Sequence, residues 1–204
     1  MKKIKFNDCI CHSNIKNHLN IKSDLLYEIT QTNDEKLDMA DKYYTDSISK
    51  LDWYKCKDFT RRWVNIFMPY FSDEIVRIMA SMGYNDVELY EMWYQQYLEN
   101  DTHGWHIHGQ QFTGVYYLEF PKGCANTQVR SPYDFQIKEI NVVEGDIIVF
   151  PAHFVHRGLP NTKQRKTIIS FNFDVIADKP DHYTGGTVTP NLNLRTLESQ
   201  NPKV

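Results

Sequence analysis

The chain has 204 residues, of which 41% are hydrophobic and 14% aromatic, and this apolar content excludes a disordered protein. Its formal net charge of -3 provides no basic field, so a nucleic-acid partner is not expected. No apolar run approaches the roughly 20 residues that span a bilayer, and the charged N-terminus lacks the apolar stretch of a secretory signal. We therefore expect a cytoplasmic protein with no membrane partner.

The cysteines do not suggest a disulfide scaffold. Cys9, Cys11, Cys56 and Cys124 are too few and too unevenly spaced for one. Cys9, Cys11 and His12 resemble half of a zinc site, but no second cysteine pair completes it. Reduced thiols in a cytosolic protein are the simplest interpretation.

Residues 1–86 are predicted to form an irregular and partly helical extension that packs on the core. Ser23 precedes apolar residues at helical spacing and predicts a short capped helix. Aromatic residues recur at helical spacing from Phe59 onward, and they are expected to pack against a sheet. Pro69 is expected to interrupt this second helical region, and Gly83 is a plausible end.

From residue 87 onward, short β-rich runs replace the helical pattern. Turn-forming residues separate these runs and no helix intervenes, which favours an antiparallel sandwich, barrel or jelly roll. The runs lie in residues 87–99, 106–120, 135–143, 146–150 and 166–176. We predict a mainly β protein with flanking helices (α+β), with its core in residues 87–178 and a C-terminal arm in residues 179–204.

Histidines are concentrated in one window, where five of the eight occur. His106 and His108 are two residues apart in a predicted strand, so alternation puts both rings on one face, close enough to share a metal ion. His156 follows a tight turn and a buried strand, and is well placed to add a third imidazole. His103 and His153 are expected to be structural or to orient the ligands. The alternative interpretation is a polar, solvated strand face.

The ordered set HIH, GVYYL, EGDIIVFPAHFVH and RKT resembles the iron- and 2-oxoglutarate-dependent oxygenases, especially those of phages and bacteria and the prolyl hydroxylases. The resemblance covers residues 87–176 and implies a double-stranded β-helix (jelly roll) preceded by a helical segment. It implies a dioxygenase that uses Fe(II), 2-oxoglutarate and O2 to hydroxylate an unactivated C–H bond, releasing succinate and CO2. The location would be the host cytoplasm if the chain is phage-encoded.

The resemblance assigns the metal to His106, His108 and His156, which would form the catalytic centre. The family generally has Asp or Glu at the position of His108. Three neutral imidazoles leave the metal with one more positive charge than the usual ligand set, which bears on O2 activation. Asp101 and His103, in the preceding loop, are reserve ligands.

The resemblance also implies a binding site for 2-oxoglutarate. Arg165, nine residues after His156, and Thr167 would hold its far carboxylate by charge-assisted hydrogen bonds. Both side chains are expected to point inward from one strand face. Tyr97 and Tyr117 stand where relatives carry tyrosines that contact the cosubstrate.

Two other functions remain open. A cupin-type metal protein or dioxygenase would not use 2-oxoglutarate, and would want a glutamate where Gln111 and Phe112 stand. A catalytically silent jelly roll would need neither the histidines nor Arg165. The substrate, a small molecule or a peptide, is not indicated, and a homodimer is common among relatives but supported by no residue.

Overall fold

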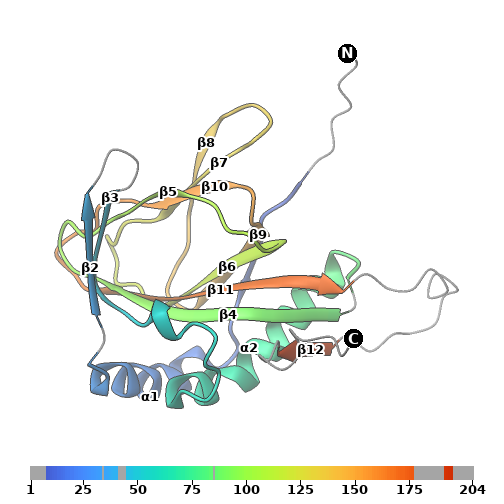
Figure 1. The fold of residues 1–204 in the computed structure, drawn as a ribbon, viewed down its shortest axis with the longest axis horizontal. Coiled ribbons are helices and arrows are strands. Elements are labelled where there is room, and N and C mark those ends of the chain that lie inside the picture. Colours follow the sequence, from blue (N-terminus) through green and yellow to red (C-terminus); the bar gives the residue numbers. More distant parts are fainter. Residues whose placement is uncertain (1–7, 34, 41–44, 85, 177–190, 195–204) are drawn as a thin grey trace, which may run out of the picture.

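The computed structural model describes residues 8–33, 35–40, 45–84, 86–176 and 191–194. Their elements form three layers, with a small sheet, a large sheet and two α-helices on the face of the large sheet that points away from the small one (Figure 1). The two sheets form a double-stranded β-helix, so the predicted jelly roll with flanking helices is confirmed.

The helical elements are α1 (His18–Gln31), the short 3₁₀ helix η1 (Trp53–Lys55) and α2 (Arg62–Ser81). Pro69 lies inside α2 without ending it, so the predicted interruption is wrong. Pro69 is exposed, and the carbonyl group that lacks its N–H partner can bind water instead. Neither of these described α-helices combines the length and the apolar character that crossing a membrane requires.

The large sheet has eight strands. In spatial order they are β1 (Cys11–Asn14), β9 (Asp146–Pro151), β6 (Phe112–Glu119), β11 (Lys166–Ile176), β4 (Asp86–Tyr97), β3 (Thr45–Leu51) and β2 (Glu35–Ala40), while β12 (Asn191–Leu194) pairs in parallel with β4. Strands β1 to β3 belong to the N-terminal segment, which therefore supplies strands that the sequence pattern did not indicate. β12 lies in the predicted C-terminal arm, and residues 179–190 and 195–204 of that arm lie outside the described residues.

The small sheet has four strands, in the order β5 (His103–His106), β10 (Val155–Gly158), β7 (Thr127–Arg130) and β8 (Ile137–Ile140). Each has only four residues, which is too short for an alternating pattern to stand out in the sequence. Antiparallel pairing of β10 with β5 sets His156 opposite His106. The small sheet therefore brings His106 and His156 together from two neighbouring strands.

Two apolar cores lie on either side of the large sheet. Between the sheet and the helices, the ring of Phe67 in α2 stacks on Tyr116 at 4.8 Å, and Ile169 joins the same cluster, so the predicted packing of the helix aromatics on a sheet is confirmed. Between the two sheets, Tyr117 and Ile168 belong to the second cluster. Neighbouring residues of one strand thus enter different cores, as strand alternation requires.

Candidate active site

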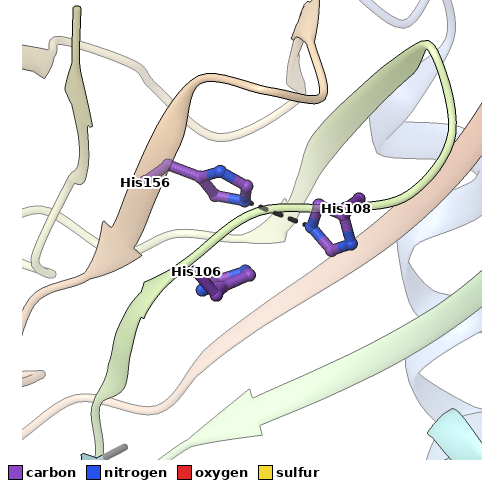
Figure 2. Close-up of side chains that lie close together, drawn as sticks. All are labelled: His106, His108 and His156. Atoms are coloured by element: carbon purple, nitrogen blue, oxygen red, sulfur yellow. Dashed lines mark hydrogen bonds between the residues drawn. The ribbon is translucent and has the colours of Figure 1, made fainter. Parts of the chain in front are cut away.

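Three histidine rings converge between the two sheets (Figure 2). One nitrogen of each of His106, His108 and His156 lies within 4.8 Å of the other two. His106 is the last residue of β5, and His156 lies opposite it in β10. The structure therefore brings together the three residues that the sequence singled out as metal ligands, whose role stays a prediction. Cys9, Cys11 and His12 form no comparable cluster in the described part of the chain.

His108 lies beyond the end of β5, in the loop that leads to β6, and not on the strand that the sequence pattern predicted. This loop is fixed by backbone and side-chain hydrogen bonds. The N–H of His108 donates to the carbonyl oxygen of Ala152 (3.2 Å), and the N–H of Gln111 donates to Asp174 Oδ1 (2.6 Å). Gln111 Oε1 in turn accepts from the N–H of Val175 (2.8 Å). The ring of His108 is thus held near the strand pair by an anchored loop.

Backbone carbonyl groups set the orientation of two of the rings. His106 Nδ1 lies 2.7 Å from the carbonyl oxygen of Gly104, and His156 Nδ1 lies 2.9 Å from that of Phe154. A carbonyl oxygen only accepts, so Nδ1 carries the hydrogen in both rings and the Nε2 lone pair is available. This arrangement is typical of metal-binding histidines, whose second nitrogen donates to an acceptor.

Burial keeps the cluster neutral. Desolvation lowers the pKa of His106, His108 and His156, and for His108 the pKa falls to about 3, with repulsion from His106 as a second cause. A metal ion binds neutral imidazole, so no proton has to leave these rings at neutral pH. Three neutral nitrogen donors fit a first-row transition ion such as iron, although none of the three is a carboxylate.

Of the three other candidate residues, only His103 lies against the histidine cluster, while Asp101 and His153 have other surroundings. The ring of His103 stacks on His106 at 3.8 Å between centroids, while its Nε2 lies 3.8 Å from Asp46 Oδ1, so it is a neighbour of the cluster. Asp101 accepts hydrogen bonds from Ser47 Oγ (2.8 Å) and from backbone N–H groups, and these fix the turn after β4. His153 is 56% exposed at the surface.

The histidines open onto a pocket between the sheets that Tyr97 and Tyr117 also line. The Tyr117 hydroxyl donates to Thr127 Oγ1 (2.7 Å), and the Tyr97 hydroxyl donates to Gln95 Oε1 (3.0 Å). Burial raises the pKa of both tyrosines, so both keep their hydroxyl hydrogen. The structure therefore places both predicted tyrosines at the pocket, and their contact with a cosubstrate stays a prediction.

Lys166, the first residue of β11, is a buried cation that lines this pocket, and it was missed by the sequence analysis. It is 3% exposed, its Nζ lies 4.4 Å above the Tyr97 ring, and it donates to the carbonyl oxygen of Ala125 (3.1 Å). Burial lowers the pKa of this amine to about 8, so most of it is protonated at neutral pH. A usable signal was present, because Phe171 and Phe173 predict the core face of the strand and leave the even-numbered positions to the other face.

Arg165 and Thr167 do not line the pocket, in contrast to the prediction. Arg165 donates to both carboxylate oxygens of Glu119, at 2.8 and 3.0 Å, and the Thr167 hydroxyl donates to Glu119 Oε2 (2.8 Å). The reason is the register of β11, because its alternation sends Thr167 to the face opposite Lys166. Because the observed register differs from the expected one by one residue, Lys166 points into the pocket in place of Arg165.

Comparison with known proteins supports the fold. No family model and no curated protein matches this sequence. Among solved structures, the non-heme alpha ketoglutarate dependent epimerase SnoN from nogalamycin biosynthesis matches with a TM-score of 0.63 and 12% identity, over 93% of this chain and 91% of that one. A prolyl hydroxylase from Trichoplax adhaerens, in complex with a hypoxia inducible factor peptide, matches with a TM-score of 0.58 and 14% identity, over 81% and 83%.

A prolyl-4-hydroxylase from Pseudomonas putida is similar to the same degree, with a TM-score of 0.56 and 12% identity over 80% of this chain and 91% of that one. At these identities the likeness shows a shared fold, the one used by 2-oxoglutarate- and Fe(II)-dependent oxygenases. It gives no support to the predicted phage origin.

Proposed function

We propose that the protein is an Fe(II)- and 2-oxoglutarate-dependent oxygenase. His106, His108 and His156 would hold the metal, and Lys166 would bind the far carboxylate of 2-oxoglutarate. The observation that supports this most is a buried ammonium group in the same pocket as three convergent neutral imidazoles. When bound, the iron would supply the oxidising chemistry by which O2 converts 2-oxoglutarate to succinate and CO2 and hydroxylates a substrate C–H bond.

Lys166 is suited to a carboxylate because its charge is otherwise poorly compensated. Its hydrogen bond to Ala125 and its contact with the Tyr97 ring stabilise the ammonium group only in part, since burial still lowers its pKa to about 8. A carboxylate at this position would form a charge-assisted hydrogen bond and return the pKa toward its ordinary value. Lys166 replaces Arg165 in the role that the sequence resemblance implied.

Hydroxyl groups that line the same pocket as Lys166 would complete the carboxylate site. Thr127 Oγ1 accepts the hydrogen of Tyr117, so the hydrogen of Thr127 itself remains free to point toward a ligand. Tyr117 therefore orients Thr127 as a donor. The substrate would enter from the open side of the pocket, and both a small molecule and a peptide stay predictions, as does a homodimer.

Anaerobic titration with Fe(II) followed by 2-oxoglutarate tests the proposal. We expect one Fe(II) per chain and, on adding 2-oxoglutarate, the visible charge-transfer absorption that its chelation to Fe(II) produces. Succinate should then be released on admission of O2. Fe(II) binding that is indifferent to 2-oxoglutarate would instead indicate the cupin-type alternative, and no metal binding would indicate a silent jelly roll.

A further inference from the structure

The three histidines differ in what their second nitrogen contacts. His106 and His156 each direct Nδ1 at a backbone carbonyl oxygen. His108 Nδ1 instead lies 3.2 Å from Asn172 Nδ2, a nitrogen that only donates. In a neutral ring, Nδ1 then accepts and the hydrogen is on Nε2, which faces His156 Nε2 at 3.3 Å (Figure 2). His108 is therefore held in the opposite tautomer from the other two rings.

A carboxylate keeps the Asn172 amide in this orientation. Asn172 is 2% exposed, and its Nδ2 also donates to Glu91 Oε2 (2.9 Å). Its Oδ1 is buried and accepts no hydrogen bond from any residue that the structure describes. Turning the amide by half a rotation would set Oδ1 against the Glu91 carboxylate and leave Nδ2 without an acceptor. The two hydrogens of Nδ2 thus go to Glu91 and to His108.

We propose that Glu91 and Asn172 are a positioning pair that sets His108 as the weak and adjustable third ligand of the metal. The inference rests on the metal centre of the proposed function. Binding through Nε2 requires the His108 hydrogen on Nδ1, where it would meet an N–H of Asn172. The hydrogen moves from Nε2 to Nδ1 by exchange with water, so the ring stays neutral, and the amide has to turn against the preference of Glu91.

The pair also accounts for a buried oxygen that lacks a partner. An unsatisfied buried acceptor is destabilising, so an orientation that leaves Asn172 Oδ1 without a donor needs a compensating contact. The charge-assisted bond to Glu91 supplies it. If His108 bound a metal through Nε2, its Nδ1–H would face the Asn172 amide. Turning the amide would then bring Oδ1 to this N–H as an acceptor. The amide can therefore serve His108 in either orientation, and Glu91 favours the one without metal, which is the orientation in the structure.

Substitution of Glu91 gives an effect of defined sign. In Glu91→Gln, the new amide can donate to Asn172 Oδ1 after the turn, so Asn172 can accept from His108 Nδ1–H. We expect Mn(II) to bind about tenfold more tightly, the scale of contacts just outside a metal's ligands. Loss of a nearby negative charge alone would weaken binding. Glu99→Gln, which removes the same charge at an exposed position, is the matched control and should leave Mn(II) affinity unchanged.

Nitrogen NMR of the imidazole rings in the metal-free protein reads the tautomers directly. We expect Nδ1–H for His106 and His156, Nε2–H for His108, and a shift of His108 toward Nδ1–H in Glu91→Gln. Nδ1–H on His108 in the unsubstituted protein would overturn the inference, as would a Glu91→Gln protein that binds Mn(II) equally or less well. Neither measurement involves 2-oxoglutarate or turnover, so the inference can fail while the oxygenase proposal stands. Failure of every variant to bind Mn(II) would refute the metal centre and both proposals.

Discussion

The two faces of β11 make opposite demands on the sequence. Toward the helices, Ile169, Phe171 and Phe173 are fully buried and apolar. Toward the pocket, Lys166 and Asn172 are just as inaccessible but carry polar groups. Burial of apolar groups stabilises the fold, whereas burial of an ammonium group or an amide opposes it unless each is fully bonded. The buried Lys166 and Asn172 therefore mark a face of β11 on which burial opposes folding, and this is the face of the proposed site.

The largest expected effect is a loss of stability from a substitution on the helix-facing side of β11. Phe171→Ala should lower the free energy of unfolding by about 3–5 kcal/mol, because its ring packs on Phe71 at 4.7 Å and leaves a cavity when removed. Its neighbour on the pocket side is the control: Ser170 makes only a 3.5 Å hydrogen bond to Gln95, so Ser170→Ala should cost less than about 1 kcal/mol. Denaturant titration measures both, and similar losses would contradict the division into a packing face and a binding face.

Removal of a histidine ring from the cluster should lower the affinity for metal. His156→Ala should weaken Fe(II) or Mn(II) binding by more than about 100-fold, beyond what contacts outside the ligand set contribute. His153→Ala, three residues away at the exposed surface, should change metal affinity by less than about twofold. Calorimetric titration with Mn(II) distinguishes the two, and equal affinities would remove His156 from the ligand set.

The register of β11 can be tested with two adjacent cations. Lys166→Ala should weaken 2-oxoglutarate binding to the Fe(II) protein by about 2–4 kcal/mol, or about 30- to 1000-fold, because a carboxylate would then be buried without a partner. Arg165→Ala removes a partly exposed ion pair with Glu119 and should leave the affinity within about threefold. The charge-transfer titration reports both. The opposite ranking would restore Arg165 as the carboxylate partner.

Lys166 should also set a pH dependence. Its pKa is about 8 in the folded chain, against 10.5 when exposed, so the unfolded chain binds more protons between these values. Lys166 should therefore contribute about 3 kcal/mol of added stability as the pH increases from 8 to 10.5, while the raised pKa values of the buried Tyr97, Tyr117 and Cys56 act in the opposite direction. 2-Oxoglutarate binding should weaken over the same range as the ammonium group is lost. Lys166→Met should remove the lysine contribution and raise stability at pH 7. Thermal unfolding of both proteins across this pH range checks the sign of the difference between them.

The sequence predicted the layers of the fold better than the details of the site. Long alternating runs such as residues 166–176 identified the central strands, and the HxH pair with a distal histidine located the cluster. The predicted run 135–143 contains β8, but β7 and β10 of the small sheet were missed, because four residues are too few for a period to be seen.

Register was the second limit on the sequence prediction. The turn before β11 does not fix which of Arg165 and Lys166 points inward, and a slip of one residue reverses every side chain. The alternation of Phe171 and Phe173 does carry this information, but the spacing from His156 was used instead. Hydrogen-bond partners were the third limit, since the pairing of Glu91, Asn172 and His108 joins residues 81 and 64 positions apart.

The anchored loop before β6 has a thermodynamic consequence. Because Gln111 exchanges hydrogen bonds with Asp174 and Val175, the segment that carries His108 is already ordered before any ligand arrives. The conformational entropy of that segment is lost during folding, so little of the free energy of ligand capture is spent on ordering it. Occupancy should accordingly raise the melting temperature strongly while leaving the shape of the chain nearly unchanged.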